Sequence, residues 1–306
     1  MQYKMKQLAG AALVAAMSLA GTANAQSTED VKIGFAGPMT GAQAHYGKDF
    51  QNGITLAVED MNATKPVIGG KQVRFVLDSA DDQADPRTGT TVAQKLVDDG
   101  IKGMLGHFNS GTTIPASRIY ANAGIPEIAM ATAPEYTQQG FKTTFRMMTS
   151  DTQQGSVAGA FAVKSLGVKK IAIVDDRTAY GQGLADQFEK AAKAAGGTIV
   201  DREYTNDKAV DFRAILTKIK GENPDAIMYG GMDATGGPFA KQAKQLGLRA
   251  KVLAGDGVCT DKLSDLAGDA TDNIVCSEAG MALEKMAGGP AFLAKYQKRF
   301  GQPIQI

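Results

Sequence analysis

Several residue types that carry chemistry are scarce in this chain of 306 residues, which has no tryptophan, two cysteines and two histidines. No Cys-x-x-Cys motif or Cys/His metal spacing occurs, which argues against a structural or catalytic metal site. The 33 basic and 32 acidic residues nearly balance and form no basic stripe, which argues against a nucleic-acid surface. After residue 25 no apolar run is long enough to cross a bilayer.

The first 25 residues have the pattern of a secretion signal. Lys4 and Lys6 precede an apolar run over 8–20, and Ala23-Asn24-Ala25 is a small-x-small cleavage site. The run is shorter than the ~20 residues of a membrane anchor, and no cysteine at the site could carry a lipid. Cleavage removes two lysines and changes the net charge from +1 to −1. We therefore expect a soluble, exported protein in the periplasm.

Cys259 and Cys276 are the only cysteines. In an exported chain such a pair suggests one disulfide, with two buried free thiols as the alternative.

The rest of the chain alternates short β-rich runs with amphipathic helical runs, in two successive series. A mature chain of this length exceeds one comfortable core, so we predict two lobes of the α/β class, each a mainly parallel doubly wound sheet. The predicted domains are an N-terminal lobe (26–149), a C-terminal lobe (150–279) and an incomplete return segment to the first lobe (280–306). Predicted strands are 31–36, 73–77, 104–106, 126–130, 170–174, 198–204, 226–230, 252–254 and 274–276. Predicted helices are 47–61, one opened by Asp85-Pro86, 113–123, 181–195, 211–220 and 236–246.

Two hydroxyl-bearing turns follow predicted strands: GHFNSGTTIPASR (Gly106–Arg118) and ATAPEYT (Ala131–Thr137). Backbone N–H groups at a helix start, together with Ser or Thr hydroxyls, suit a carboxylate. Ser110 and Thr132 are the hydroxyls that we expect to act in this way. The alternative for each is an ordinary helix cap.

Two further residues follow strands of the second series. Asp256, in the sequence GDGV, could pair with a ligand ammonium across the cleft, or could be a turn aspartate. Tyr180 could line the cleft, while Gly181 and Gly183 give a tight turn that lacks the dinucleotide-binding spacing.

His107 lies three residues before Ser110, which suggests a base beside a nucleophile in an exported hydrolase. No Gly-x-Ser-x-Gly elbow or orienting carboxylate can be identified, so we expect His45 and His107 to be structural. The acidic residues around Asp82, from Asp78 to Asp85, lack a calcium-loop pattern and predict a solvated turn.

Six segments in this order and spacing resemble the periplasmic branched-chain amino-acid (Leu/Ile/Val) binding proteins of ABC importers. They are GPMTGAQAHYGKDFQNGITLAVEDMNA, GHFNSGTTIPAS, ATAPEYT, AIVDDRTAYGQGLA, DAIMYGG and GDGV, and the resemblance runs from Val31 to the end. It implies a two-lobed binding protein that captures an amino acid, delivers it to a membrane permease, catalyses no reaction and needs no cofactor.

The resemblance also implies roles for individual residues. Ser110 and Thr132 would hold the ligand α-carboxylate, Ala131 or Met130 would offer a carbonyl to the ammonium, and Asp256 would pair with the ammonium. Tyr180 would close the site from the second lobe, while Tyr46 and Phe108 would border the ligand side chain.

The chain departs from the family pattern at three places. Asp256 stands where well-known members carry Glu, so its reach to the ammonium differs by one methylene, and Met232 stands where an aromatic is familiar, which leaves the side-chain preference open. The family's first-lobe disulfide positions fall near Asp82 and Asn109, so we expect that bridge to be absent here. Family members also continue well beyond GQPIQI, with segments that complete the first lobe and make a third hinge crossing. The alternatives are a receptor of the same fold for an aromatic amino acid, short amide or aromatic acid, and a sensory ligand-binding protein. We expect a monomer.

Overall fold

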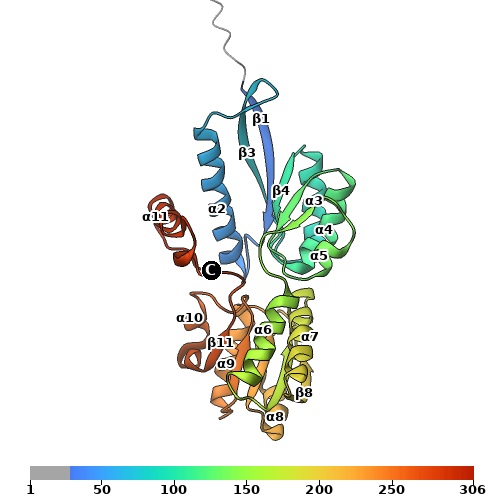
Figure 1. The fold of residues 1–306 in the computed structure, drawn as a ribbon, viewed down its shortest axis with the longest axis vertical. Helices are drawn as coiled ribbons and strands as arrows, with labels where there is room; N and C mark the ends of the chain where they lie inside the picture. Colours follow the sequence, from blue (N-terminus) through green and yellow to red (C-terminus); the bar gives the residue numbers. More distant parts are fainter. Residues whose placement is uncertain (1–27) are drawn as a thin grey trace, which may run out of the picture.

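Two sheets organise residues 28–306, which are the residues that the computed structural model describes, and they form two lobes stacked end to end (Figure 1). The first sheet has the order β2-β3-β1-β4-β5-β6 and is parallel except for the β2–β3 pair. Its strands are β1 (Glu29–Gly37), β2 (Val67–Ile68), β3 (Lys71–Asp81), β4 (Gly103–Gly106), β5 (Glu127–Ala129) and β6 (Thr144–Arg146). Its helices are α2 (Ala44–Ala63), α3 (Pro86–Asp98), α4 (Ser110–Asn122) and α5 (Glu135–Gln138).

The second sheet has the order β11-β10-β9-β7-β8 and is parallel throughout. Its strands are β7 (Lys170–Asp175), β8 (Thr198–Tyr204), β9 (Ala226–Gly230), β10 (Lys251–Ala254) and β11 (Ile274–Cys276). Its helices are α6 (Asp151–Lys164), α7 (Ala179–Ala194), α8 (Arg213–Glu222), α9 (Asp233–Gln245), α10 (Leu263–Ala267) and η1 (Gly268–Asn273). The chain ends with η2 (Leu283–Lys285) and α11 (Gly289–Phe300). Because helices cover both faces of this sheet, β7 and β9 are buried almost throughout and have no polar alternation.

The α/β class and the two mainly parallel sheets are confirmed, and every predicted strand is present. The Asp85-Pro86 helix start is also confirmed, since Asp85 accepts a hydrogen bond from the Thr88 N–H at 2.8 Å. The predicted starts of three helices are wrong, because α2 begins at Ala44 rather than Gly47, α4 at Ser110 rather than Thr113 and α9 at Asp233 rather than Gly236. Pro115 therefore lies inside α4. Helix α6, strand β6 and helix α11 were not predicted.

Helix α11 packs against α2 of the first lobe, at the left of Figure 1. The Tyr296 hydroxyl donates to Asp49 Oδ1 at 2.6 Å, and Arg299 pairs with Glu59 at 2.9 Å. The domain boundaries at 149/150 and 279/280 stay a prediction, and the predicted signal peptide lies outside the described residues.

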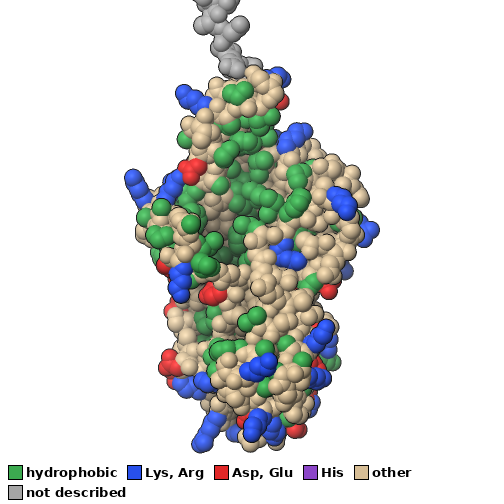
Figure 2. Space-filling view, viewed as in Figure 1, with side chains coloured by type: hydrophobic (Ala, Val, Ile, Leu, Met, Phe, Trp, Pro, Cys, Tyr) green, Lys and Arg blue, Asp and Glu red, His purple; other side chains and the backbone are tan. Residues whose placement is uncertain are grey.

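One face of the first sheet is open to solvent beside α2. A groove of about 270 Å³ runs there, and Figure 2 shows apolar side chains across it. It is lined by Ile33, Ile54, Ala57, Val58, Met61, Phe75, Gly103, Met104, Leu105, Pro126 and Ile128. Within residues 28–306, no helix is both long and apolar enough to cross a membrane.

The two cysteines form a disulfide, with Cα atoms 5.7 Å apart. It ties the loop after β10, which carries Asp256, to the end of β11. The prediction of a bridge is therefore confirmed over two free thiols.

Candidate functional site

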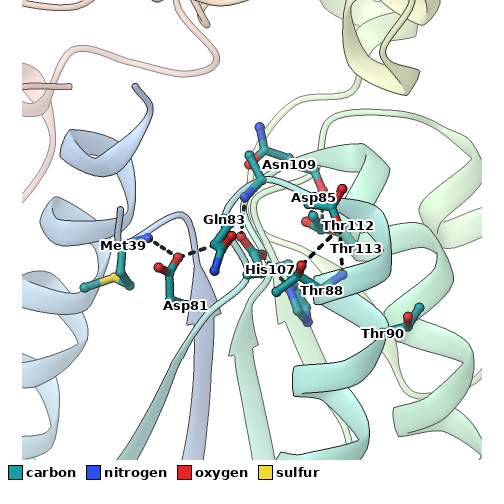
Figure 3. A network of polar contacts seen from close by, with 12 residues as sticks. Met39, Asp81, Gln83, Asp85, Thr88, Thr90, His107, Asn109, Thr112 and Thr113 are labelled. Atoms are coloured by element: carbon teal, nitrogen blue, oxygen red, sulfur yellow. Dashed lines mark hydrogen bonds and ion pairs between the residues drawn. The ribbon is translucent and has the colours of Figure 1, made fainter. Parts of the chain in front are cut away.

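The start of α4 and the loop after β5 form one side of the candidate site. The Thr112 and Thr113 hydroxyls both donate to the Asn109 carbonyl, at 2.9 and 2.8 Å, so they are used within the first turn of the helix (Figure 3). Ser110 differs, since its Oγ accepts a hydrogen bond from the Ala133 N–H at 3.3 Å. The structure therefore joins the two predicted hydroxyl turns through Ser110, and both its hydroxyl and Ala133 are buried.

A buried histidine–carboxylate pair lies near this turn. His107 Nδ1 lies 2.7 Å from Asp82 Oδ2, and His107 Nε2 lies 3.1 Å from the Tyr120 hydroxyl. All three side chains are fully buried, and Figure 3 shows His107 next to the loop of Asp81, Gln83 and Asp85. The prediction of a solvated turn is therefore wrong for Asp82, whose carboxylate is covered because it pairs with a distant histidine. Since both ring nitrogens of His107 are engaged, none is left to activate Ser110, and His107 is structural.

The 130–133 segment is held from two sides. Arg146 Nη1 donates to the Ala133 carbonyl at 2.8 Å, and the Met130 N–H donates to the His107 carbonyl at 3.3 Å. The Thr132 carbonyl accepts from the Asp151 N–H at 2.9 Å, which ties this loop to the first residue of α6. Thr132 is thus fixed at the point where the chain passes from the first sheet to the second.

The second lobe contributes Tyr180 and Asp256. The Tyr180 hydroxyl donates to Asp256 Oδ1 at 2.8 Å and accepts from the Gly257 N–H at 3.0 Å. Tyr180 lies in the first turn of α7, which Thr178 caps by accepting from the Gly181 N–H at 2.9 Å. Asp256 follows β10, so both residues lie at the carboxyl edge of a parallel sheet, where ligands of open α/β folds bind.

Aromatic side chains close the space between the lobes. The Tyr46 hydroxyl, on α2, donates to the Gly257 carbonyl of the second lobe at 2.7 Å. The Tyr46 ring stacks on Phe108 with centroids 4.8 Å apart. Tyr46, Tyr180 and Met232 belong to one buried apolar cluster, against which Phe108 packs. The structure therefore brings Tyr46 and Phe108 of the first lobe against Tyr180 and Met232 of the second.

Asp151 was missed by the sequence analysis, together with the helix that it begins. Its side chain is fully buried, and neither carboxylate oxygen has a hydrogen-bond partner among the described residues. Burial raises the pKa of Asp151 to about 7, and the charge of Asp256 adds to the rise. Gln154, one turn later on α6, is also buried and lies against Gly255 together with the Tyr180 hydroxyl. The Ser150-x-x-Gln153 pattern was the available signal, since Ser150 accepts from the Gln153 N–H at 3.4 Å and caps α6.

The electrostatics of this region favour a cation. Burial raises the pKa of the Asp256 carboxyl, although the Tyr180 hydroxyl partly offsets the effect by hydrogen bonding to the carboxylate. A positive group beside Asp256 and Asp151 would offset the desolvation of both carboxylates. Across residues 28–306, no group of three or more His, Cys, Asp or Glu side chains could hold a metal ion.

Comparison with known proteins points to one family. Residues 30–306 match the family described as periplasmic binding protein. The chain is 39% identical over 267 residues to Leu/Ile/Val-binding protein homolog 1 of Brucella abortus, a match that covers 87% of this chain and 70% of the relative.

Solved structures share the fold, including two that contain a bound ligand of known chemistry. The branched-chain amino acid transporter substrate binding protein LivJ of Streptococcus pneumoniae, in complex with isoleucine, superposes with a TM-score of 0.80 at 29% identity, covering 90% of this chain and 79% of LivJ. A solute binding protein of an ABC transporter from Rhodopseudomonas palustris, in complex with 3,4-dihydroxy benzoic acid, superposes with a TM-score of 0.77 at 30% identity, covering 90% and 76%. The chain therefore belongs to the periplasmic binding proteins and is a solute-binding protein of this family.

Proposed function

We propose that this protein captures an α-amino acid with an aliphatic side chain between its lobes and delivers it to an ABC importer. The observation that carries the proposal is the placement of a half-buried carboxylate, Asp256, which accepts from the Tyr180 hydroxyl, on the lobe that faces the joined hydroxyl turns of Ser110 and Thr132. Asp151 lies close to both sides, since its backbone N–H donates to the Thr132 carbonyl and its carboxylate is near enough to that of Asp256 for the two negative charges to repel. A zwitterionic amino acid needs hydrogen-bond donors for its carboxylate, which the two hydroxyl turns could supply, and a nearby carboxylate for its ammonium.

The ligand carboxylate would lie at the start of α4. Ser110 and Thr132 would donate their hydroxyls, and the backbone N–H groups of these turns would add further donors with the positive end of the helix dipole. On ligand binding, the Ser110 hydroxyl would donate to the carboxylate while still accepting from Ala133. The carbonyl of Ala131 or Met130 would accept from the ligand ammonium.

The ligand ammonium would pair with Asp256. Burial raises the pKa of this carboxyl, so a cation in contact with it stabilises the ionised form. The Tyr180 hydroxyl holds Asp256 in place by donating a hydrogen bond to it. Tyr180 itself would close the site from the second lobe. Burial raises the pKa of Asp151 to about 7, so a bound ammonium nearby would favour ionisation of this second carboxyl.

The ligand side chain would face Tyr46, Phe108 and Met232. Met232 is flexible and polarizable, so it can adapt to apolar groups of different shape. In an apolar pocket, two ligands that differ by one methylene differ in binding free energy by only about 1–3 kcal/mol. We therefore propose aliphatic amino acids as a class and not one member of it.

An aromatic acid is the second candidate, and the Rhodopseudomonas palustris structure with a bound benzoic acid supports it. The carboxylate of such a ligand would bind to the two hydroxyl turns, and the ligand has no ammonium to pair with Asp256. Asp256→Asn distinguishes the two, because it removes the charge that only an amine needs.

We further propose that residues 1–25 direct export to the periplasm and are removed, and that the mature protein is a monomer without cofactor or catalytic activity. Its lobes would be residues 26–149 and 150–279, with 280–306 returning to the first. Closure around the ligand would present both lobes to a permease.

A thermal-shift panel on the protein from Gln26 tests the proposal, with the twenty amino acids, short amides and aromatic acids. A ligand at 100 times its dissociation constant stabilises the folded state by about 2.7 kcal/mol. We expect a shift with aliphatic amino acids and its loss in Asp256→Asn. A shift confined to aromatic acids, unchanged in that variant, would support the second candidate. A cooperative melt that no compound shifts would contradict both.

A further inference from the structure

A buried histidine–carboxylate pair joins the lobes outside the expected ligand contacts. His45 Nε2 lies 2.8 Å from Asp233 Oδ2, and the two residues are 6% and 0% exposed. His45 is the second residue of α2 in the first lobe, and Asp233 is the first residue of α9 in the second. The contact therefore exists only when these two helix ends meet.

Within the second lobe, Asp233 is held to the loop that carries Asp256. Its backbone N–H donates to the Gly257 carbonyl at 2.7 Å, and its Oδ2 also accepts from the Thr260 hydroxyl at 2.7 Å. The Gly257 carbonyl is the group that accepts from Tyr46 across the cleft. The pair thus lies beside the ligand region without being part of it.

We propose that His45 and Asp233 form an interlobe clasp that sets how long the closed state persists, and through it the rate of ligand dissociation. The inference deepens the proposed function and rests on it for the identity of the ligand. When the lobes separate, both side chains lose this contact and return to water, so its free energy enters the opening equilibrium directly. Apparent affinity scales with the population of the closed, binding-competent state.

Removing His45 or Asp233 should mainly increase the rate at which the ligand dissociates. In the closed state His45→Ala leaves a buried carboxylate without its interlobe partner, and truncation of one member of a buried pair raises the dissociation rate. We expect the ligand dissociation rate of His45→Ala and of Asp233→Asn to rise at least about tenfold, a size typical of such truncations, with association changed little.

Thr260→Val is the matched control. It removes the other hydrogen bond to the same oxygen of Asp233, but that bond lies within the second lobe. We expect its dissociation rate to stay within about twofold of the wild type. An increase equal to that of His45→Ala would show that the position of Asp233, not the contact between lobes, matters, and would overturn the proposal.

The experiment measures dissociation by stopped-flow, using whichever amino acid shifts the wild-type melt. The single variants, the His45→Ala/Asp233→Asn double variant and the control are compared, and melting of the ligand-free proteins checks that each folds. The clasp predicts that the second substitution adds little to the first, because the contact is already lost. Wild-type rates in His45→Ala, or fully additive effects in the double variant, would contradict it.

Failure of the proposed function remains distinguishable. If no amino acid binds the wild type, that function fails, and the clasp is tested by the distance between spin labels placed on exposed positions, one in each lobe, without ligand. The clasp then predicts a smaller closed population in His45→Ala than in the wild type. Identical distance distributions would overturn it.

Discussion

Tyr46→Phe should weaken ligand binding by a small and calculable amount. The substitution removes the hydroxyl that donates to the Gly257 carbonyl at 2.7 Å, while the stacking of the ring on Phe108 is retained. The carbonyl keeps a second donor, the Asp233 N–H, so no buried acceptor is left unpaired. The binding free energy should therefore decrease by the net contribution of one hydrogen bond, about 0.5–1.5 kcal/mol. This corresponds to an increase in Kd of about 2- to 12-fold.

The hydrogen bond of Tyr46 crosses the lobes, so it stabilises the closed state and not either lobe alone. Isothermal titration should show the increase in Kd, while calorimetry of the ligand-free protein should show a melting temperature close to that of the wild type. Tyr204→Phe is the control, since Tyr204 lies in the second lobe and is 58% exposed. An unchanged Kd in Tyr46→Phe would refute the closing role of the hydroxyl. A 100-fold increase would show that the hydroxyl contacts the ligand itself.

Three further predictions concern charge and covalent structure. Asp256→Asn should raise the Kd for amino acids about 10- to 150-fold, because a hydrogen bond to a charged group contributes about 1.5–3 kcal/mol. Titration with an aromatic acid should show no such change. The pKa of Asp151 is about 7 in the folded state and has an ordinary value of 3.8. Between these two pH values the Asp151 carboxyl is therefore ionised in the unfolded chain and mostly protonated in the folded one. The free energy of unfolding should therefore fall as pH rises through this window, with Asp151 contributing about 1.4 kcal/mol per pH unit, and urea unfolding of Asp151→Asn should show a flatter profile. Replacing Cys259 and Cys276 by Ser opens a loop with a sequence separation of 17, which should cost about 3 kcal/mol and lower the melting temperature by about 6–12 °C in calorimetry. An unchanged melt would contradict the loop-closure argument.

Prediction from the sequence succeeded where the signal is local. Runs such as 170–174 and 226–230 are apolar because helices cover both faces of their sheet, and a short apolar run bounded by turns indicates such a strand. Asp85-Pro86 was recognised as a helix start because the cap acts on an N–H only three residues away. The disulfide was predictable because an exported chain with two cysteines has one possible pairing.

Local signals failed at the start of α4. Proline is best tolerated in the first turn of a helix, so Pro115 favoured a start near Thr113. The helix instead begins at Ser110, where two threonine hydroxyls bond to Asn109 and where Ser110 meets Ala133, a residue 23 positions away. The burial of Asp82 was missed for the same reason, since its partner His107 is 25 positions away.

The sequence by itself determined the two α/β series, the turns that end their strands and, through the family resemblance, the residues expected at the ligand. The tertiary structure alone decided which residues meet between the lobes. Tyr46 and Gly257 are 211 positions apart, and His45 and Asp233 are 188 apart. Periodicity and capping describe interactions within a few residues, so they carry no information about such pairs. The pKa of Asp151 is likewise raised by burial in the folded chain, which no local sequence pattern reveals.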